Sequence, residues 1–427
     1  MKLLTTIIAF FILPNIYGQV SFLNNLKVQE NNFFYKDSIN GQITFGDYEP
    51  TGIVSMKDGS LIVSTKFSIT FPGQYTTPIT FNAEYFEREK IFSQKSHVCS
   101  GSLFKLDSNY QKQWEIIFKE RRVVGIKKLS DENILIVGER TDMKQFWIAK
   151  ISPDGKILFE KSYKFKRKPS VENMEIDSLD NIHVLLSAER LYPIRIRKYY
   201  GRIRLEFFKE SEMENDLYLL KISPNGKIKW QTTIDNRKNI STYGYDLVIK
   251  NGIYISTRFS GFVKTPKGNI KSEGKMIYEI CAAGKIKTKY PIENKRIFSI
   301  RNQLLFATTA RNDSLVISQK AANRYNPIET IIFNNDIEQF WTEKALSSDS
   351  NNYFFGTHHH NLGCLMVKLD KQNRYLGYWK DSLENISSFV DATIKPDNSV
   401  VIIATHYSLL NSTDSNKKYS IKIMTIK

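Results

Sequence analysis

Two sequence patterns alternate from one end of the chain to the other. The first is an apolar run that usually ends in Lys-Ile or Lys-Leu, then a tight turn, then an alternating run that ends near an aromatic residue. It occurs at 102–114, 147–159, 217–230, 277–288 and 365–379. Because Asn225-Gly226 and Asp154-Gly155 supply the positive φ angles that tight hairpin turns need, we predict that each copy is a β-hairpin.

The second pattern lies between these hairpins and reads as a strand, a polar turn and another strand. Its copies are found at 53–66, 125–140, 173–189, 245–258, 297–309, 344–358 and 392–406. Together the two patterns make a four-stranded unit, A-B-C-D, with a period of tens of residues, which is typical of a β-propeller blade. Seven A–B pairs predict an all-β chain with a single seven-bladed propeller; the alternative is two smaller β domains.

The two ends of the sequence indicate how the ring closes. The last blade ends at 419–427 without a D strand. Residues 38–45, "SINGQITF", are similar to "SPNGKIKW" at 223–230. We therefore expect 38–45 to pair beside 419–427 as the missing fourth strand, which would leave no open sheet edge there.

The first residues have the pattern of a secretory leader. Lys2 is followed by an apolar run from Leu3 to Leu13, then Pro14 and the small Gly18. We expect residues 1–18 to be a signal peptide, 19–37 a lead segment and 38–427 the propeller, with the mature protein secreted or periplasmic. A membrane anchor is the alternative, although the run is short for a spanning helix and no later segment is apolar enough.

The hairpin pattern K-[IL]-[SD]-x-x-G-K-I-x-W, with Asp-Gly or Asp-Asn turns in the preceding strand pairs, resembles the repeats of secreted bacterial β-propeller proteins. The resemblance covers nearly all of the mature chain and implies the fold rather than a function. The aromatic-ended hairpin also looks like the repeats of quinone-dependent dehydrogenases. Those need a regular Trp set, whereas Phe159 and Thr288 stand where other copies have Trp. We therefore expect no quinone and no other cofactor.

A formal net charge of +17 favours polyanionic partners. A secretory leader argues against intracellular nucleic acid, so the expected partner is an anionic polysaccharide or an acidic protein surface. The alternative is that the basic excess serves solubility alone.

In five blades the end of the B strand carries a small residue followed by Thr and then one polar residue, and Arg140 and Glu189 stand at about the same place in the other two blades. In a propeller these positions share one face with the B–C loops, where ligands commonly bind. We interpret the basic members as an anion-binding rim; the alternative is that strand ends are simply polar because they meet water. The basic members are Lys66, Arg140, Arg258, His358 and His406, and Thr309 and Glu189 occupy the other two places.

The stretch "YPIRIRKYYGRIRLEFF" at 192–208 falls in the B–C loop of the third blade and alternates apolar and basic residues. With a four-residue turn at 198–201, Arg197 would face Arg202 and Arg195 would face Arg204. Such a row of like charges needs an acidic partner, either a ligand or the nearby segment 210–216.

Catalytic motifs and metal-ligand spacings are not evident in the sequence. His358 and His406 hold equivalent positions in neighbouring blades, but no spacing singles out a third ligand. We therefore expect a non-catalytic binding or scaffold protein. The alternative is a carbohydrate-active enzyme, a hydrolase or lyase, whose inner-strand acids would be Asp246, Asp391 and Glu343.

Overall fold

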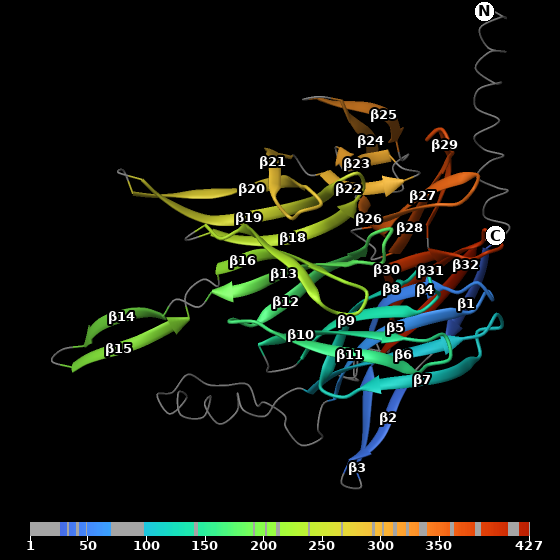
Figure 1. Cartoon of the computed structure of the whole chain (residues 1–427), viewed down its shortest axis with the longest axis horizontal. Coiled ribbons are helices and arrows are strands. Elements are labelled where there is room, and N and C mark those ends of the chain that lie inside the picture. The colour runs from blue at the N-terminus through green and yellow to red at the C-terminus, as the bar shows by residue number, and fades with distance from the viewer. Residues whose placement is uncertain are drawn as a thin grey trace, which may run out of the picture.

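Seven four-stranded antiparallel sheets form a ring in the computed structural model (Figure 1). The predicted all-β, seven-bladed propeller is confirmed. The structure describes residues 26–426 apart from 32–33, 40–41, 48, 70–97, 141–143, 191–192, 201–202, 211–213, 238–239, 266–267, 293–294, 301–302, 311–313, 322–323, 333–339, 359–362, 381–385 and 409–417.

The blades follow one another in chain order, each running from an inner A strand to an outer D strand. Blade 1 has β4 (Glu49–Ser55), β5 (Leu61–Ile69), β6 (Val98–Leu106) and β7 (Lys112–Phe118). Blade 2 has β8 (Arg121–Lys128), β9 (Ile134–Arg140), β10 (Gln145–Ile151) and β11 (Ile157–Lys164). Blade 3 has β12 (Pro169–Ile176), β13 (Ile182–Arg190), β16 (Glu214–Ile222) and β17 (Ile228–Asp235). Blade 4 has β18 (Ile240–Ile249), β19 (Ile253–Thr265), β20 (Gly268–Ile280) and β21 (Ile286–Pro291).

The remaining blades complete the circle. Blade 5 has β22 (Lys295–Ile300), β23 (Gln303–Ala310), β24 (Ser314–Ala321) and β25 (Arg324–Ile332). Blade 6 has β26 (Phe340–Ser347), β27 (Asn351–His358), β28 (Gly363–Asp370) and β29 (Tyr375–Lys380). Blade 7 has β30 (Ile386–Ile394), β31 (Val400–Ser408) and β32 (Lys418–Ile426), and its fourth strand is β1 (Leu26–Asn31).

Ring closure by an N-terminal strand is confirmed, but the strand is not the one predicted. β1 pairs antiparallel with β32, from Leu26 opposite Ile426 to Asn31 opposite Ile421. Residues 38–45 instead fold on themselves in the hairpin of β2 (Phe34–Ile39) and β3 (Gln42–Asp47). The reason is local: Asn-Gly is a strong two-residue hairpin signal, and here it joins two strands of one ribbon.

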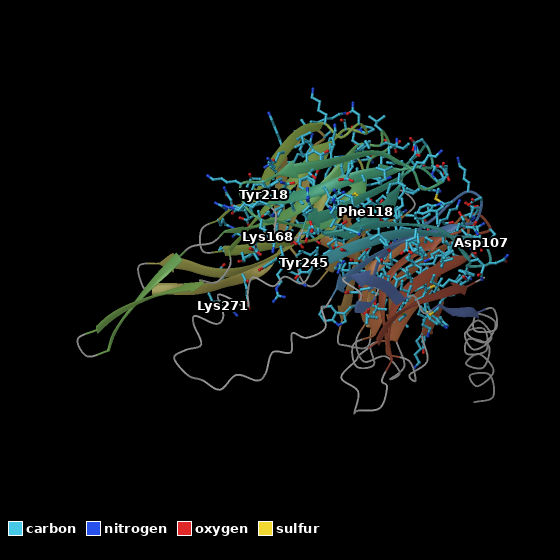
Figure 2. The ribbon with its side chains drawn as sticks, turned by 90° about the horizontal axis from the view of Figure 1, so that it is seen from below. Asp107, Phe118, Lys168, Tyr218, Tyr245 and Lys271 are labelled. Carbon is cyan, nitrogen blue, oxygen red and sulfur yellow. The ribbon has the colours of Figure 1, made fainter. Side chains whose placement is uncertain are left out.

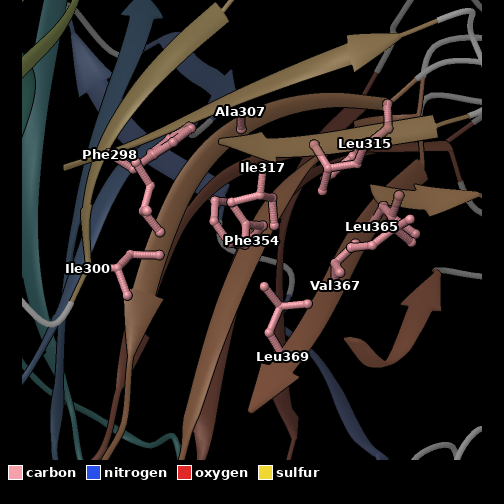
Figure 3. Packing of buried hydrophobic residues seen from close by; sticks show 12 residues of the cluster. Phe298, Ile300, Ala307, Leu315, Ile317, Phe354, Leu365, Val367 and Leu369 are labelled. Atoms are coloured by element: carbon pink, nitrogen blue, oxygen red, sulfur yellow. The ribbon is translucent and has the colours of Figure 1, made fainter. Parts of the chain in front are cut away.

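The core is divided into seven apolar clusters, one at each boundary between neighbouring blades. Figure 3 shows the cluster between blades 5 and 6, in which Phe298 and Phe354 meet edge to face with ring centroids 5.7 Å apart. Successive side chains of a strand point to opposite faces of its blade, and each face packs against a neighbouring blade. Both faces of the B and C strands are therefore apolar where they meet these neighbours.

The aromatic residue that ends several hairpins fastens one blade to the turn of the next. Trp114 Nε1 donates to the Pro153 carbonyl at 3.3 Å, and Trp230 Nε1 donates to the Ala282 carbonyl at 3.2 Å. The residue at this turn position needs both a left-handed backbone conformation and no side chain. Gly284 has φ +84°, and a Cβ there would lie 2.9 Å from the Trp230 ring. The repeat motif thus encodes a contact between blades as well as a hairpin.

Long B–C connections project from one end of the ring, which we call the B–C end (Figure 1). β14 (Pro193–Tyr200) and β15 (Ile203–Glu210) form a separate ribbon between β13 and β16, so the Arg-rich stretch lies in the B–C loop of blade 3, as predicted. β19 and β20 stay paired out to Thr265 opposite Gly268. Within the part of the chain described, no helix is long and apolar enough to cross a membrane.

Candidate functional site

A cavity of about 630 Å³ lies on the axis of the ring, and all seven inner strands contribute to its wall. Its charged lining residues are Lys127, Glu172, Glu175, Asp246, Arg296, Glu343, Lys344 and Asp391. The wall is therefore a mixture of acids and bases rather than an apolar plug, and the predicted approach of Asp246, Asp391 and Glu343 to the axis is observed.

Six of the seven inner strands contain a β-bulge near their B–C end, and β22 pairs with β23 without one over the described residues. A bulge inserts one unpaired residue and re-aims its side chain. The extra residues are Thr51, Val124, Glu172, Tyr245, Glu343 and Val390. Two of these six are glutamates, and both line the cavity.

Asp246 and Asp391 hold neighbouring blades together. Asp246 Oδ2 accepts from the Ile297 amide of blade 5 at 3.0 Å, and its Oδ1 accepts from Arg296 Nε at 2.6 Å. Asp391 likewise accepts from the Ile53 amide of blade 1 at 3.0 Å. These carboxylates are hydrogen-bonded across blade boundaries, so they are structural parts of the wall.

Asp391 also bonds to Lys344 of blade 6, and that ammonium donates to the Ala392 carbonyl at 2.7 Å. Lys127 pairs with Glu175 in the same way between blades 2 and 3. Arg296, the third base of the cavity wall, is bonded to Asp246. Each base of the wall is thus paired with one of its acids.

Glu172 and Glu343 differ from these acids, because neither lies in an ion pair among the described residues. Glu343 accepts from Thr357 Oγ1 at 2.7 Å, and Glu172 accepts from Ser187 Oγ. Desolvation by the surrounding wall raises the pKa of both carboxyls above the ordinary value, although Glu343 keeps part of its surface in contact with solvent; nearby Glu139 adds to the rise at Glu172, and Arg296 opposes the rise at Glu343. These are the acids in the wall that are best placed to hold a proton.

Exposed aromatic side chains lie on the inner strands just beyond the cavity toward the B–C end. Trp341 is 58% exposed and precedes Glu343 on β26, while Tyr243 and Tyr245 are 38% and 37% exposed on β18. Figure 2 labels Tyr245, together with Lys271 on the blade 4 hairpin, whereas Asp107 lies toward the opposite end of the molecule. Flat, exposed rings beside a polar cavity are suited to stacking on a ring-shaped ligand.

The described basic residues of the predicted rim have different environments. Lys66 is engaged by Glu49 at 2.7 Å. Arg140 is half-buried opposite Arg121 in the strand register, and its Nε has no hydrogen-bond partner among the described residues. Arg258 is exposed opposite Tyr243. The rim as a set stays a prediction, and Arg258 is its best-placed member.

The other predicted site residues cannot be placed by their side chains. His358 and His406 belong to β27 and β31, and Arg195, Arg197 and Arg204 to the blade 3 ribbon, but their side chains lie outside the described residues, as does the whole of Arg202. Over the described residues, no group of three His, Cys, Asp or Glu side chains is arranged to hold a metal ion.

The register predicted for the Arg-rich ribbon is wrong. The strands pair through Tyr200 opposite Ile203, which puts Glu206 opposite Arg197 and Phe208 opposite Arg195. The pairing leaves two residues, 201–202, for the turn instead of four, because a Gly-containing pair suffices for a tight hairpin. Arg197 therefore stands across from an acid of its own ribbon rather than another arginine.

Lys275, Arg296, Tyr243 and Trp341 are the functional candidates that sequence reasoning missed. Lys275 lies directly opposite Arg258 on β20, which only the strand register reveals. No sequence signal singled out Trp341, because Phe340, directly before it at the start of the same inner strand, is fully buried.

No known family model matches the sequence, and no curated protein matches it. Several hundred solved structures are similar in fold. The Dos1 propeller has a TM-score of 0.48 at 8% identity over 93% of this chain and 82% of that one. The polysaccharide lyase Uly1 has a TM-score of 0.44 at 9% identity over 94% and 98%. The subtype N11 neuraminidase-like protein of A/flat-faced bat/Peru/033/2010 (H18N11) has a TM-score of 0.42 at 6% identity over 94% of this chain and 95% of that one. At these identities the likeness concerns the propeller fold alone.

Proposed function

We propose that this chain is an exported, non-catalytic propeller that binds an anionic glycan at the B–C end of its axial cavity. The observation that carries the proposal is the combination of exposed Trp341 and Tyr243 with the cations Arg258 and Lys275 at the B–C end of the blades, beyond the residues that line the polar cavity. Aromatic faces favour sugar rings, and guanidinium and ammonium groups favour their acidic substituents. Export rests on the leader pattern at 1–18.

A glycan is favoured over an acidic protein surface because the candidate residues lie beside an axial cavity and not on a broad flat patch. A protein partner needs a broad patch, commonly about 800 Å² on each side, whereas a cavity flanked by separate aromatic rings suits a chain of small rings. The basic excess of the whole chain would attract either partner, so the shape of the site decides between them.

The test is a panel of immobilised glycans presented to the purified full chain, scored both for retention and for new reducing ends or unsaturated products. Trp341→Ala and Tyr243→Ala are each expected to weaken retention about tenfold, as the loss of about 1.4 kcal/mol implies. Leu179→Ala is the matched control, since Leu179 is 75% exposed on an A–B turn. Retention by acidic proteins but by no glycan would refute the proposal.

A second candidate function is glycan cleavage, and the raised pKa of Glu172 and Glu343 is the observation that favours it. A carboxyl with a raised pKa holds its proton to a higher pH than an ordinary carboxyl does, which suits a general acid. Asp246 and Asp391 do not suit this role, because they are committed to backbone amides of the next blade. New reducing ends that disappear in Glu343→Gln would establish an enzyme in place of a binding protein.

A further inference from the structure

Three neighbouring strands of blade 4 bring a polar row to the B–C end. In the strand register Tyr243 of β18 stands opposite Arg258 of β19, and Arg258 stands opposite Lys275 of β20. Residues directly opposite in antiparallel strands share one face of the sheet, about 5 Å apart. Ile277, two residues beyond Lys275, packs in the cluster shared with blade 5. The row therefore faces blade 5.

Blade 5 contributes a third cation to the same place. Arg296, near the start of β22, donates through Nε to Asp246 Oδ1 at 2.6 Å, and its guanidinium carbon lies 6.0 Å from the centre of the Tyr245 ring. Its two terminal Nη groups have no partner among the described residues. Asp246 thus fixes the guanidinium while leaving its outer edge available for a ligand.

The three cations have acids near them but few direct ion pairs: Asp246 is bonded to Arg296, the charge of Glu343 acts on Arg296, and that of Glu273 acts on Arg258. Lys275 is half-buried, and neither its ammonium nor the guanidinium of Arg258 is in an ion pair over the described part of the chain. The nearby Glu273 is engaged by Lys271 at 2.9 Å. Burial, with Arg258 and Arg296 adding to it, holds the pKa of Lys275 below its ordinary value despite Asp246. Such crowding of like charge is unfavourable unless an anion offsets it.

The apolar core is also smallest at this boundary. Over the described residues, five buried apolar side chains form the cluster between blades 4 and 5, against twelve between blades 5 and 6. The B–C end of this boundary is therefore formed by polar side chains that an apolar core does not cover.

We propose that Arg258, Lys275 and Arg296 form an oxyanion subsite between blades 4 and 5, which takes one carboxylate or sulfate group of an acidic sugar. The proposal rests on the proposed function for the rest of the ligand, with Tyr243 beside the subsite to contact the sugar ring. Two guanidinium forks and an ammonium match the several acceptor oxygens of such a group, and Asp246 keeps out a second anion.

Calorimetric titration of the full chain with sodium sulfate and sodium acetate tests the subsite without a glycan. Chondroitin sulfate, hyaluronan and dextran then separate sulfate, carboxylate and neutral sugars as sources of the ligand group. Arg258→Gln and Lys275→Met are each expected to weaken binding of the preferred anion about tenfold or more, as loss of a charge-assisted hydrogen bond implies. Lys229→Met, on the exposed outer strand β17, is the control and should bind like the parent.

The outcomes separate this inference from the proposed function. Anion binding that both variants weaken, with retention of a charged glycan but not of dextran, supports both. Binding of sulfate or acetate without retention of any glycan supports the subsite and refutes the glycan as its source. Glycan binding that Arg258→Gln and Lys275→Met leave unchanged overturns the subsite while the proposed function stands. Fold is checked by circular dichroism, and a rise of the Lys275 pKa on binding is an independent readout.

Discussion

The two sides of blade 5 are built differently. Toward blade 6 it is joined by a continuous apolar cluster in which Phe298, Phe354 and Leu365 are fully or nearly fully buried (Figure 3). Toward blade 4 the apolar cluster is short, and Asp246 connects the two blades through the Ile297 amide. Packing holds the first boundary together, whereas hydrogen bonds and an ion pair share that task at the second.

This difference indicates where a ring of similar blades can carry a binding site. An apolar boundary gives most stability when it is sealed, so it offers a ligand nothing. A boundary that relies on polar groups keeps some of their hydrogen-bonding capacity for a ligand, at a cost in stability. The blade 4–5 boundary is of this second kind, and it lies beside the B–C end of the axial cavity.

The largest effect is expected from truncating matched phenylalanines on either side of blade 5. Phe354 and Phe306 are both fully buried on B strands, in the blade 5–6 and blade 4–5 clusters respectively. Each change to Ala should cost about 3–5 kcal/mol, with Phe354→Ala at the upper end because its neighbours are more numerous and leave a larger cavity. Chemical denaturation measures both, and an equal or reversed order would contradict the comparison.

Asp246→Asn should affect stability and binding in opposite directions. The substitution keeps an acceptor for the Ile297 amide but removes the charge that pairs with Arg296. We expect the free energy of unfolding to fall by about 1–2 kcal/mol, while affinity for sulfate rises because an anion has left the subsite. Asp349→Asn, at an exposed turn position, is the control. Weaker sulfate binding in the variant would show that Asp246 matters more for positioning Arg296 than for charge.

Two turn glycines distinguish the cost of a left-handed backbone from the cost of contact between blades. Gly59 has φ +77°, and a Cβ added there would have nothing within 4 Å, whereas a Cβ at Gly284 would meet the Trp230 ring. Gly59→Ala should cost about 1 kcal/mol from backbone strain alone, and Gly284→Ala about 2 kcal/mol. Thermal unfolding of both variants measures the stability that each one loses. Equal losses would mean that the Trp230 ring moves aside for the added methyl group at no cost in free energy.

The smallest effect is expected from Glu343→Gln, which should stabilise the protein at neutral pH but not at acidic pH. The pKa of Glu343 is higher in the folded than in the unfolded protein, so protonation of this carboxyl stabilises the fold. That stabilisation is fully present below the unfolded-state pKa and is lost as pH rises through the folded-state pKa. Glu343→Gln removes this titration and keeps an acceptor for Thr357. The variant should unfold at a higher temperature than the parent at about pH 7 and at nearly the same temperature at about pH 4. A constant difference across this range would argue against a protonated Glu343.

Much of the fold could be predicted from sequence because the repeat encodes turns and contacts between blades. The A–B pairs and most C–D hairpins carry Gly or Asn at the turn, and most of the C–D hairpins also end near an aromatic residue. The C–D hairpin of blade 5, β24 and β25, was missed because it lacks the Lys-Ile or Lys-Leu pair before the turn and has no glycine in the turn. The closing strand β1 was missed for a similar reason: it contributes backbone hydrogen bonds to β32 and needs no motif of its own.

The candidate site was less predictable, because it depends on register and on distance across the ring. Arg258 could be chosen from an alignment of strand ends, but its neighbour Lys275 lies in another strand, and Arg296 in another blade. The inner-strand acids were recognised, yet their roles were not. A bulge decides which glutamates stay unpaired, and no residue pattern in the sequence announces a bulge.

The central claim is that the ligand lies at the B–C end between blades 4 and 6, and hydrogen exchange with and without a retained acidic glycan tests it most directly. Protection is expected in 240–246, 256–260 and 274–278 of blade 4 and in 340–344 of blade 6, with no change in the A–B turns such as 177–181. Protection confined to those turns, or to the outer D strands, would contradict the account.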